Sequence, residues 1–203
     1  GDITFTPNAG FTGQAQFTYT ASDGKAGTDT AKVVIDFQDT ADQFTFWNTS
    51  STPAILTDSD TSAVNLGLKF MVETDGEIDA LRYYKSAGNA GPHTGYLWSD
   101  TGTLLAKVDF TNESSQGWQQ ATLSAPIKVS ANQTFVVSYF APKGGYSVTE
   151  NYFTNPLDVG PMTAIKTGGV YAYGGSGVFP TQTHLSSNYW VDVVFDPANS
   201  TSG

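Results

Sequence analysis

The 203-residue chain contains no cysteine, so no disulfide framework, thiolate metal site or cysteine nucleophile can form. Basic residues are also scarce: nine lysines and arginines face 19 acids, which gives a net charge of −10, and Arg82 is the only arginine. A nucleic-acid binder needs a basic surface to replace the counterions of phosphates, so we expect no nucleic-acid partner. The same sign of charge argues against binding to anionic lipid.

Long apolar runs are missing as well. No run approaches the roughly 18 residues of a membrane span, so we expect no membrane insertion. The first residues have neither the basic start nor the apolar stretch of a secretory signal, and we expect an internal piece of a longer protein.

Signatures of catalysis are equally absent. His93 and His184 are the only histidines, and no Gly-x-Ser-x-Gly elbow, His-x-x-His pair or phosphate-binding loop occurs. Two carboxylates on a β-scaffold could still hydrolyse a glycoside, but no such pair stands out. We therefore expect a protein that is not an enzyme.

What the chain does contain is a series of short alternating segments separated by turn residues, with almost no helical periodicity. Residues 64–72 alternate strictly, with five apolar side chains on one face. The other predicted strands are 2–7, 15–20, 31–37, 77–84, 93–99, 104–110, 118–123, 133–140 and 189–195. The pattern predicts an all-β chain whose main part is an antiparallel β-sandwich of jelly-roll type.

Alternation within these strands also predicts the core. The core set is Leu66, Leu68, Phe70, Val108, Phe110, Val137, Val191, Val193 and Phe195. In 104–110 the inward side chains are Leu104, Ala106, Val108 and Phe110, and in 189–195 Tyr189 also points inward. Residues 141–188 contain eight glycines but few clean alternations, so we predict long ordered loops there, where binding residues tend to lie.

A change of pattern divides the chain. Three strands are too few for an independent sheet, so residues 1–38 are predicted to end a domain that begins upstream. A polar linker at 39–43 leads into the predicted sandwich at 44–196, and 197–203 form a tail.

The first part resembles a known bacterial repeat. The residues that carry the resemblance are 1–7, 11–13, 17–24 and 29–35. They look like the C-terminal half of a cadherin-like, immunoglobulin-like tandem repeat from the stalks of bacterial adhesins and secreted polysaccharide-processing proteins. The resemblance implies an extracellular or cell-surface location, with further domains of the same long chain as neighbours.

The second part resembles a bacterial domain family of unknown function that recurs beside immunoglobulin-like and carbohydrate-active modules. The residues that carry this resemblance are 81–85, 93–98, 102–105, 112–113, 117–119, Pro126, Tyr139, 179–180 and 188–192. The family implies a β-sandwich in a secreted protein but supplies no ligand.

Acidic clusters suggest calcium, a hard cation that prefers several oxygen ligands from flexible loops. The candidate ligands are Asp23, Asp29, Asp39, Asp42, Asp58 and Asp60. Calcium binding between cadherin-like repeats favours the linker acids. For any single cluster, solvated turn residues are the alternative.

Aromatic residues provide the strongest functional signal, because the apolar C–H face of a sugar packs on a flat ring. The predicted carbohydrate-binding residues are Tyr84, Trp98, Trp118, Tyr173 and Trp190, with Arg82, His93 and Asp192 as polar partners. If Val191 and Val193 point inward, Trp190 and Asp192 point outward; Leu97 inward would likewise turn Tyr96 and Trp98 outward. The alternative is that these rings fill the core.

The polar partners have alternatives of their own. The Arg82 fork can hold a carboxylate or vicinal hydroxyls, or it can pair with Asp79, Glu113 or Asp192 inside the domain. A lone histidine in a strand, such as His93, is more often a structural hydrogen-bonding group.

The sequence thus favours a non-catalytic extracellular module that binds a polysaccharide or cell-surface glycan with the help of calcium. The alternative is a structural spacer of an adhesin stalk with no ligand of its own. The loop-rich stretch 141–190 favours the binding module, since a spacer has no use for it.

Overall fold

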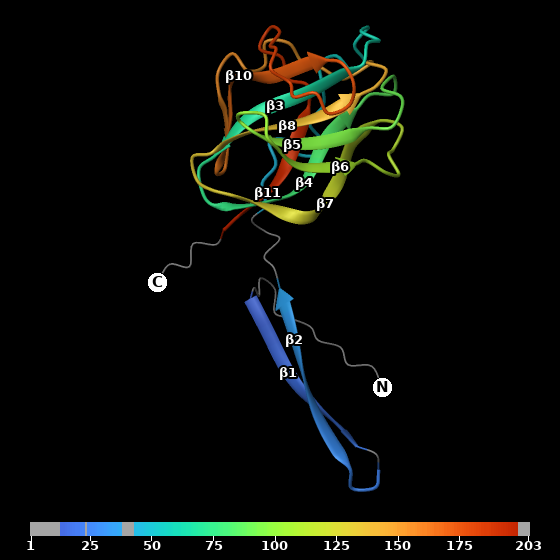
Figure 1. The fold of residues 1–203 in the computed structure, drawn as a ribbon, viewed down its shortest axis with the longest axis vertical. Coiled ribbons are helices and arrows are strands. Elements are labelled where there is room, and N and C mark those ends of the chain that lie inside the picture. The colour runs from blue at the N-terminus through green and yellow to red at the C-terminus, as the bar shows by residue number, and fades with distance from the viewer. Residues whose placement is uncertain (1–12, 23, 38–42, 199–203) are drawn as a thin grey trace. The chain divides into compact units, whose positions relative to one another are not determined.

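The computed structural model describes residues 13–22, 24–37 and 43–198, and leaves the side chains of 13–15 and 35–37 undescribed. The chain forms two compact units, Gly1–Asp42 and Gln43–Gly203. All regular structure in the described residues is β-strand (Figure 1). None of these residues belongs to a helix that could cross a membrane.

The first unit contains an antiparallel hairpin. Strand β1 (Gly13–Ser22) pairs with β2 (Thr28–Phe37), from Gly13 opposite Phe37 to Ser22 opposite Thr28. Gly24 lies in the connecting turn with φ +70°, a conformation that glycine adopts without steric cost. The predicted strand 2–7 lies outside the described residues.

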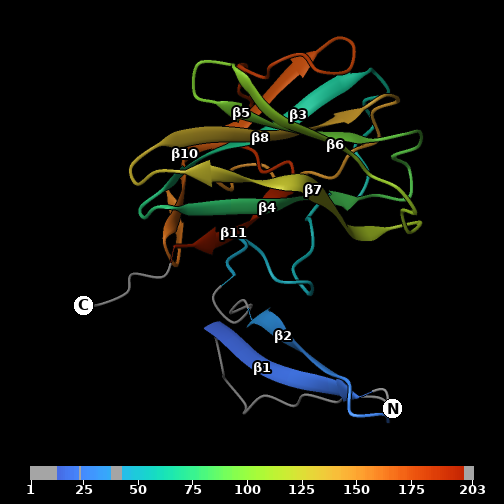
Figure 2. The ribbon, with the colours of Figure 1, turned by 60° about the horizontal axis from the view of Figure 1, so that its bottom comes forward.

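The second unit is a sandwich of two antiparallel sheets, as the sequence pattern predicts (Figure 2). Its strands are β3 (Val64–Val72), β4 (Gly76–Lys85), β5 (Thr94–Ser99), β6 (Leu104–Asp109), β7 (Gly117–Val129), β8 (Thr134–Ala141), β9 (Leu157–Val159), β10 (Met162–Tyr173) and β11 (Val191–Pro197). The larger sheet has the order β6-β5-β8-β3-β10-β9, and the smaller sheet has the order β11-β4-β7.

The predicted core lies between the sheets, with one correction. Eight of its nine residues are buried, but Val108 is only half-buried, and Leu104 of the same strand is 47% exposed. Both lie on β6, which ends the larger sheet and pairs only with β5 among the described strands. An edge strand is covered on fewer sides, so its inward positions stay accessible to water.

Residues 141–188 require a second correction, because they contain β9 and the 12-residue strand β10. Ala164 pairs with Phe70 and Gly169 with Leu68, so residues 165–168 bulge out of the ladder. A bulge breaks the two-residue period, which explains why the sequence shows no clean alternation there.

Candidate functional site

Five of the eight predicted sugar-binding residues come together, but they form part of the interior. Three indoles, from Trp47, Trp118 and Trp190, make a tryptophan cluster with centroid separations of 5.4 to 6.1 Å. Arg82 Cζ lies 4.6 Å from the ring centroid of Trp118, and the Tyr84 ring meets Trp118 edge-on. Only Trp118 of the cluster is partly accessible.

The prediction that Trp190 and Asp192 face solvent is wrong. Trp190 is 3% exposed and Asp192 is fully buried. Phe44 forms a β-bridge with Phe195, and the backbone N–H groups of Phe46 and Trp47 donate to the Asp192 carboxylate at 3.0 and 3.4 Å. The segment before the first strand of the sandwich therefore covers the outer side of β11, where Asp192 lies. Trp190 precedes β11 and has φ +55°, so strand alternation does not apply to it.

Asp192 also pairs with Arg82, at 3.2 Å between carboxylate and guanidinium. This is the internal ion pair that the sequence left open as the alternative. Burial raises the pKa of Asp192 to about 6, although Arg82 and three backbone N–H groups oppose the shift. Neither side chain has a face left for a sugar.

His93 belongs to a second buried network. Its Nδ1 lies 2.9 Å from the Glu113 carboxylate and its Nε2 lies 2.8 Å from Asn89 Oδ1. Tyr83 and Lys85 donate to the same carboxylate, both at 2.7 Å. Burial lowers the pKa of His93. The structure thus gives His93 the role of a structural hydrogen-bonding group.

For Trp98, the predicted side of the strand is correct, but the predicted exposure is wrong. Leu97 packs in the main core, whereas Tyr96 and Trp98 form a separate cluster on the other face of the sheet. The ring centroids of Phe179 and Trp98 are 5.5 Å apart, and Tyr96 Oη is 2.5 Å from Ser176 Oγ. The segment after β10 therefore covers this face and leaves Trp98 5% exposed.

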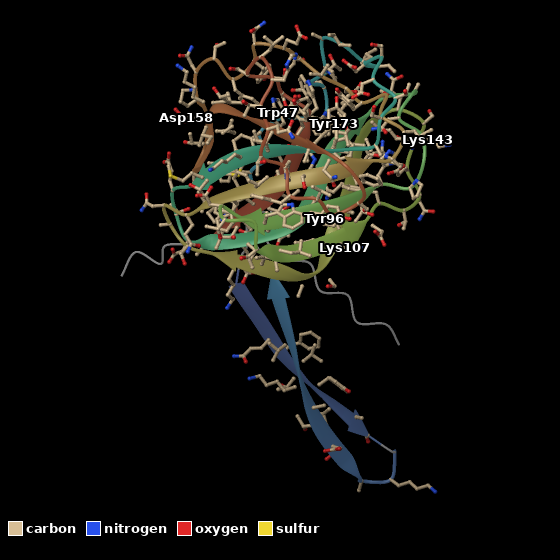
Figure 3. The ribbon with its side chains drawn as sticks, turned by 45° about the horizontal axis from the view of Figure 1, so that its top comes forward. Trp47, Tyr96, Lys107, Lys143, Asp158 and Tyr173 are labelled. Carbon is tan, nitrogen blue, oxygen red and sulfur yellow. The ribbon has the colours of Figure 1, made fainter. Side chains whose placement is uncertain are left out.

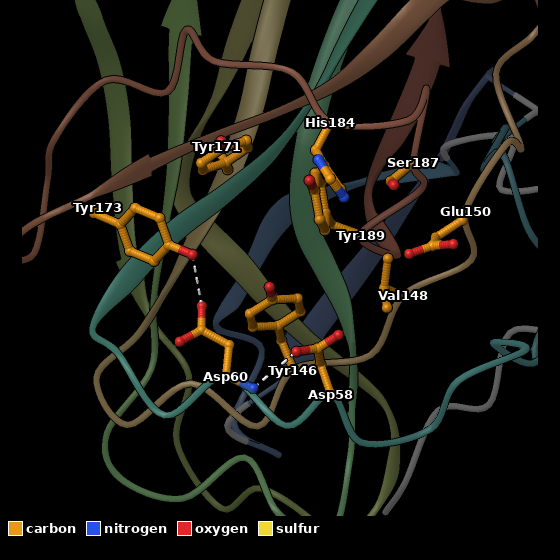
Figure 4. Close-up of a pocket in the computed structure, with 10 residues that line it drawn as sticks. All are labelled: Asp58, Asp60, Tyr146, Val148, Glu150, Tyr171, Tyr173, His184, Ser187 and Tyr189. Atoms are coloured by element: carbon orange, nitrogen blue, oxygen red, sulfur yellow. Dashed lines mark hydrogen bonds between the residues drawn. The ribbon is translucent and has the colours of Figure 1, made fainter.

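Tyr173 is the predicted ring that stays accessible, at 52% exposed, and it stands at the end of β10 (Figure 3). It belongs to an open cavity of about 390 Å³, here called the tyrosine pocket (Figure 4). The pocket is lined by Asp58, Asp60, Tyr146, Val148, Glu150, Tyr171, Tyr173, His184, Ser187 and Tyr189. This volume lies in the range of sites for small molecules.

Four segments that are distant in sequence build the pocket: 58–60, 146–150, the end of β10, and 184–189. Backbone hydrogen bonds hold them in register. Ile55 bridges to Val148, and Asp58 N donates to the Tyr146 carbonyl at 2.8 Å. Tyr171 exchanges two backbone hydrogen bonds with Gln182.

The four tyrosine rings meet edge to face. The centroids of Tyr173 and Tyr171 are 5.6 Å apart at 74°, and those of Tyr171 and Tyr189 are 6.3 Å apart at 70°. Tyr189 and Tyr146 follow at 5.9 Å and 77°. Successive rings therefore form walls that stand nearly perpendicular to one another.

Two of the lining carboxylates are fixed by hydrogen bonds. Asp60 accepts from the Ser62 N–H and from the Tyr173 hydroxyl, both at 2.8 Å, and Asp58 accepts from the Asp60 N–H at 2.8 Å. Burial opposes ionisation of Asp60, but these hydrogen bonds outweigh it and lower its pKa. The bond to Asp60 raises the pKa of Tyr173 to about 12. At neutral pH the pocket thus pairs a neutral phenol with an ionised acid.

Residues 50–191 match the family described as "Domain of unknown function (DUF4082)". The chain belongs to this family. Residues 1–36 match a bacterial Ig domain, which confirms the immunoglobulin-like interpretation of the first part. Together the two matches indicate a domain of a surface protein. No curated protein matches the chain.

The candidate calcium ligands are only partly described. Asp23, Asp39 and Asp42 lie outside the described residues. Asp29 is exposed on the hairpin and accepts from the Thr30 N–H at 2.9 Å. Asp58 and Asp60 lie together in the tyrosine pocket of the DUF4082 unit. In the described part of the chain, no three Asp, Glu or His side chains gather as a metal site.

The set predicted from sequence misses most of the tyrosine pocket. It contains Tyr173 as a ring and Asp58 and Asp60 as metal ligands, but not Tyr146, Tyr171 or Tyr189. The available signal was regional: the tyrosine- and glycine-rich stretch 141–190 provides eight of the ten lining residues. No local pattern joins that stretch to residues 58–60.

Proposed function

We propose that the DUF4082 unit is a non-catalytic carbohydrate-binding module of a large bacterial surface or secreted protein, and that the tyrosine pocket is its binding site. The first unit would be part of a cadherin-like, immunoglobulin-like adhesin stalk that displays the module outside the cell. The observation that carries the proposal is an open cavity whose walls combine four tyrosines with three carboxylates.

The chemistry of a sugar suits this combination. Ring faces can cover the apolar C–H surface of a pyranose, and carboxylates can accept hydrogen bonds from its hydroxyls. Tyr173 offers an accessible ring whose orientation is set by the bond from its hydroxyl to Asp60. Such preorganisation reduces the entropy lost on binding. We expect micromolar to millimolar affinity for one site, strengthened by multivalent display.

The test is a glycan-array screen of the full chain, followed by calorimetric titration of the oligosaccharides that bind. Tyr173→Ala should weaken binding about tenfold, because roughly 1.5 kcal/mol of apolar contact is removed. Tyr19→Ala is the matched control, since Tyr19 is 44% exposed on the hairpin of the first unit. Absence of binding to every glycan would reject the proposal and favour a spacer.

Calcium is the second part of the proposal, at Asp58 and Asp60. Each carboxylate already holds a backbone N–H, so a calcium ion would use the remaining oxygens, water and sugar hydroxyls. Titration of the same glycan in millimolar calcium and in chelator measures this contribution. Equal affinities would remove calcium from the proposal and leave sugar binding intact.

A further inference from the structure

The tyrosine pocket has a one-sided charge. Asp58, Asp60 and Glu150 line it, whereas neither lysine nor arginine is among its lining residues. The chain as a whole carries a net charge of −10, so the surrounding field has the same sign. A uronic or sialic acid would meet repulsion here, and a ligand with a positive charge would be attracted.

The ring geometry points in the same direction. The accessible ring of Tyr173 can cover one sugar face, and successive tyrosine rings of the pocket meet at 70° to 77°. Perpendicular aromatic walls can direct several π-faces toward one compact group. A cation near such faces is stabilised by the ring quadrupole, and this is how aromatic cages hold ammonium groups.

We propose that the tyrosine pocket selects sugars that carry a free amine, such as 2-amino-2-deoxyhexose units, over their N-acetylated and acidic counterparts. In the calcium-free pocket, the ammonium group lies against the tyrosine rings and pairs with the carboxylates, while the remaining sugar hydroxyls bind at the rim; calcium at Asp58 and Asp60 would compete with it. This inference rests on the proposed carbohydrate-binding function and names its ligand class.

The experiment compares three oligosaccharides of equal length by calorimetry at low salt, in chelator and at a pH below the pKa of the sugar amine: glucosamine, N-acetylglucosamine and galacturonic acid oligomers. The glucosamine oligomer should bind about tenfold more tightly than the acetylated one, which is the size that one cation–π contact and one partly screened ion pair supply together. Added salt should reduce this ratio, since it screens exposed charges. The galacturonic acid oligomer should not bind.

Glu150→Gln removes one carboxylate charge at the pocket with little change of shape. It should lower affinity for the glucosamine oligomer severalfold and leave the acetylated oligomer unaffected. Glu73→Gln is the matched control. Glu73 is exposed, follows the C-terminal end of β3 and is absent from the pocket lining, whereas Asp58 and Asp60 of the pocket precede the N-terminal end of that strand. A ratio that is the same in both variants would contradict the inference.

The outcomes separate this inference from the function on which it rests. If the acetylated or acidic oligomer binds as tightly as the glucosamine oligomer, and Tyr173→Ala weakens that binding, the inferred selectivity for a free amine is wrong. The tyrosine pocket then remains the proposed sugar-binding site. If no oligosaccharide binds, both are overturned. Binding of choline without any sugar would also reject both, and would show that the pocket is a cation site for another ligand.

Discussion

At the scale of single residues, accessibility separates the rings that hold the fold from those that can meet a ligand. Trp98 and Trp190 are 5% and 3% exposed, whereas Tyr173 is 52% exposed. The buried indoles also use their N–H groups internally: Trp98 donates to Ser138 Oγ at 2.9 Å, and Trp190 donates to Thr149 Oγ1 at 3.0 Å. Contact area and hydrogen bonds both make these two indoles structural.

We therefore predict that Trp98→Ala and Trp190→Ala each lower the free energy of unfolding by about 3–5 kcal/mol, because each leaves a large cavity. Tyr173→Ala should lower it by less than about 1 kcal/mol, since little buried surface is lost. Urea unfolding followed by tryptophan fluorescence gives all three values. Equal losses in the three variants would contradict the division.

Burial of the Asp192 carboxylate makes stability depend on pH in an unusual direction, although its ion pair with Arg82 opposes the shift. The pKa of Asp192 is about 6 in the folded protein and near 3.8 when unfolded, so the folded state binds the proton more tightly. This contribution is complete below pH 3.8 and is lost as the pH rises through 6. It amounts to up to about 3 kcal/mol, from a shift of about two pH units.

A comparison with Asp192→Asn isolates the contribution of Asp192 to the pH dependence. It is needed because other acids, such as Glu113, whose pKa is lowered, act in the opposite direction. The stability of the wild type relative to this variant should fall between pH 4 and pH 7. A constant offset is expected in addition, since the variant leaves Arg82 buried without its partner. Parallel profiles of wild type and variant would show that Asp192 does not titrate in this range.

At the scale of elements, β10 joins the fold to the pocket. Its last residues carry Tyr171 and Tyr173, and its middle is overlain by the segment that carries Ser187. A Cβ on Gly169 would lie 1.6 Å from the Ser187 carbonyl oxygen. Only glycine allows this close approach of two backbones.

Gly169→Ala should consequently displace residues 184–189, lower the melting temperature by several degrees and weaken glycan binding. Gly175→Ala is the matched control two residues beyond the strand, where a Cβ meets nothing within 4 Å. Melting curves and titration with the same oligosaccharide check both effects. Unchanged behaviour of Gly169→Ala would contradict the assigned role of this contact.

At the scale of the whole molecule, the second unit completes its core from its own residues. The main cluster of buried side chains extends from Phe46 to Phe195. We predict that a chain shortened to residues 43–203 keeps the urea midpoint and the glycan affinity of the full chain. A lower midpoint would mean that the first unit contributes to the stability of the second.

The sequence predicted the strands best where alternation is regular. Residues 64–72 and 133–140 coincide closely with β3 and β8, because the side-chain period of a strand is a local property. Strand prediction failed at β10, where residues 165–168 bulge; at β6 the predicted strand 104–110 is correct, but the predicted burial of its inward side chains is wrong, because the sheet ends there. Both failures depend on the neighbouring strand, which the sequence does not identify.

The sequence by itself determined that the chain is all-β and, where alternation is regular, which side chains share a face of a strand. Only the tertiary structure decided which faces meet water. Residues 44–47 cover Asp192 and the segment around Phe179 covers Trp98, so outward-pointing residues became interior ones. The tyrosine pocket likewise depends on contacts between segments more than 80 residues apart. The hydrogen bond from the Tyr173 hydroxyl to Asp60 is an example, since it spans 113 positions. Long-range packing of this kind leaves no periodic trace in a sequence, because each segment satisfies its own local pattern independently of what covers it.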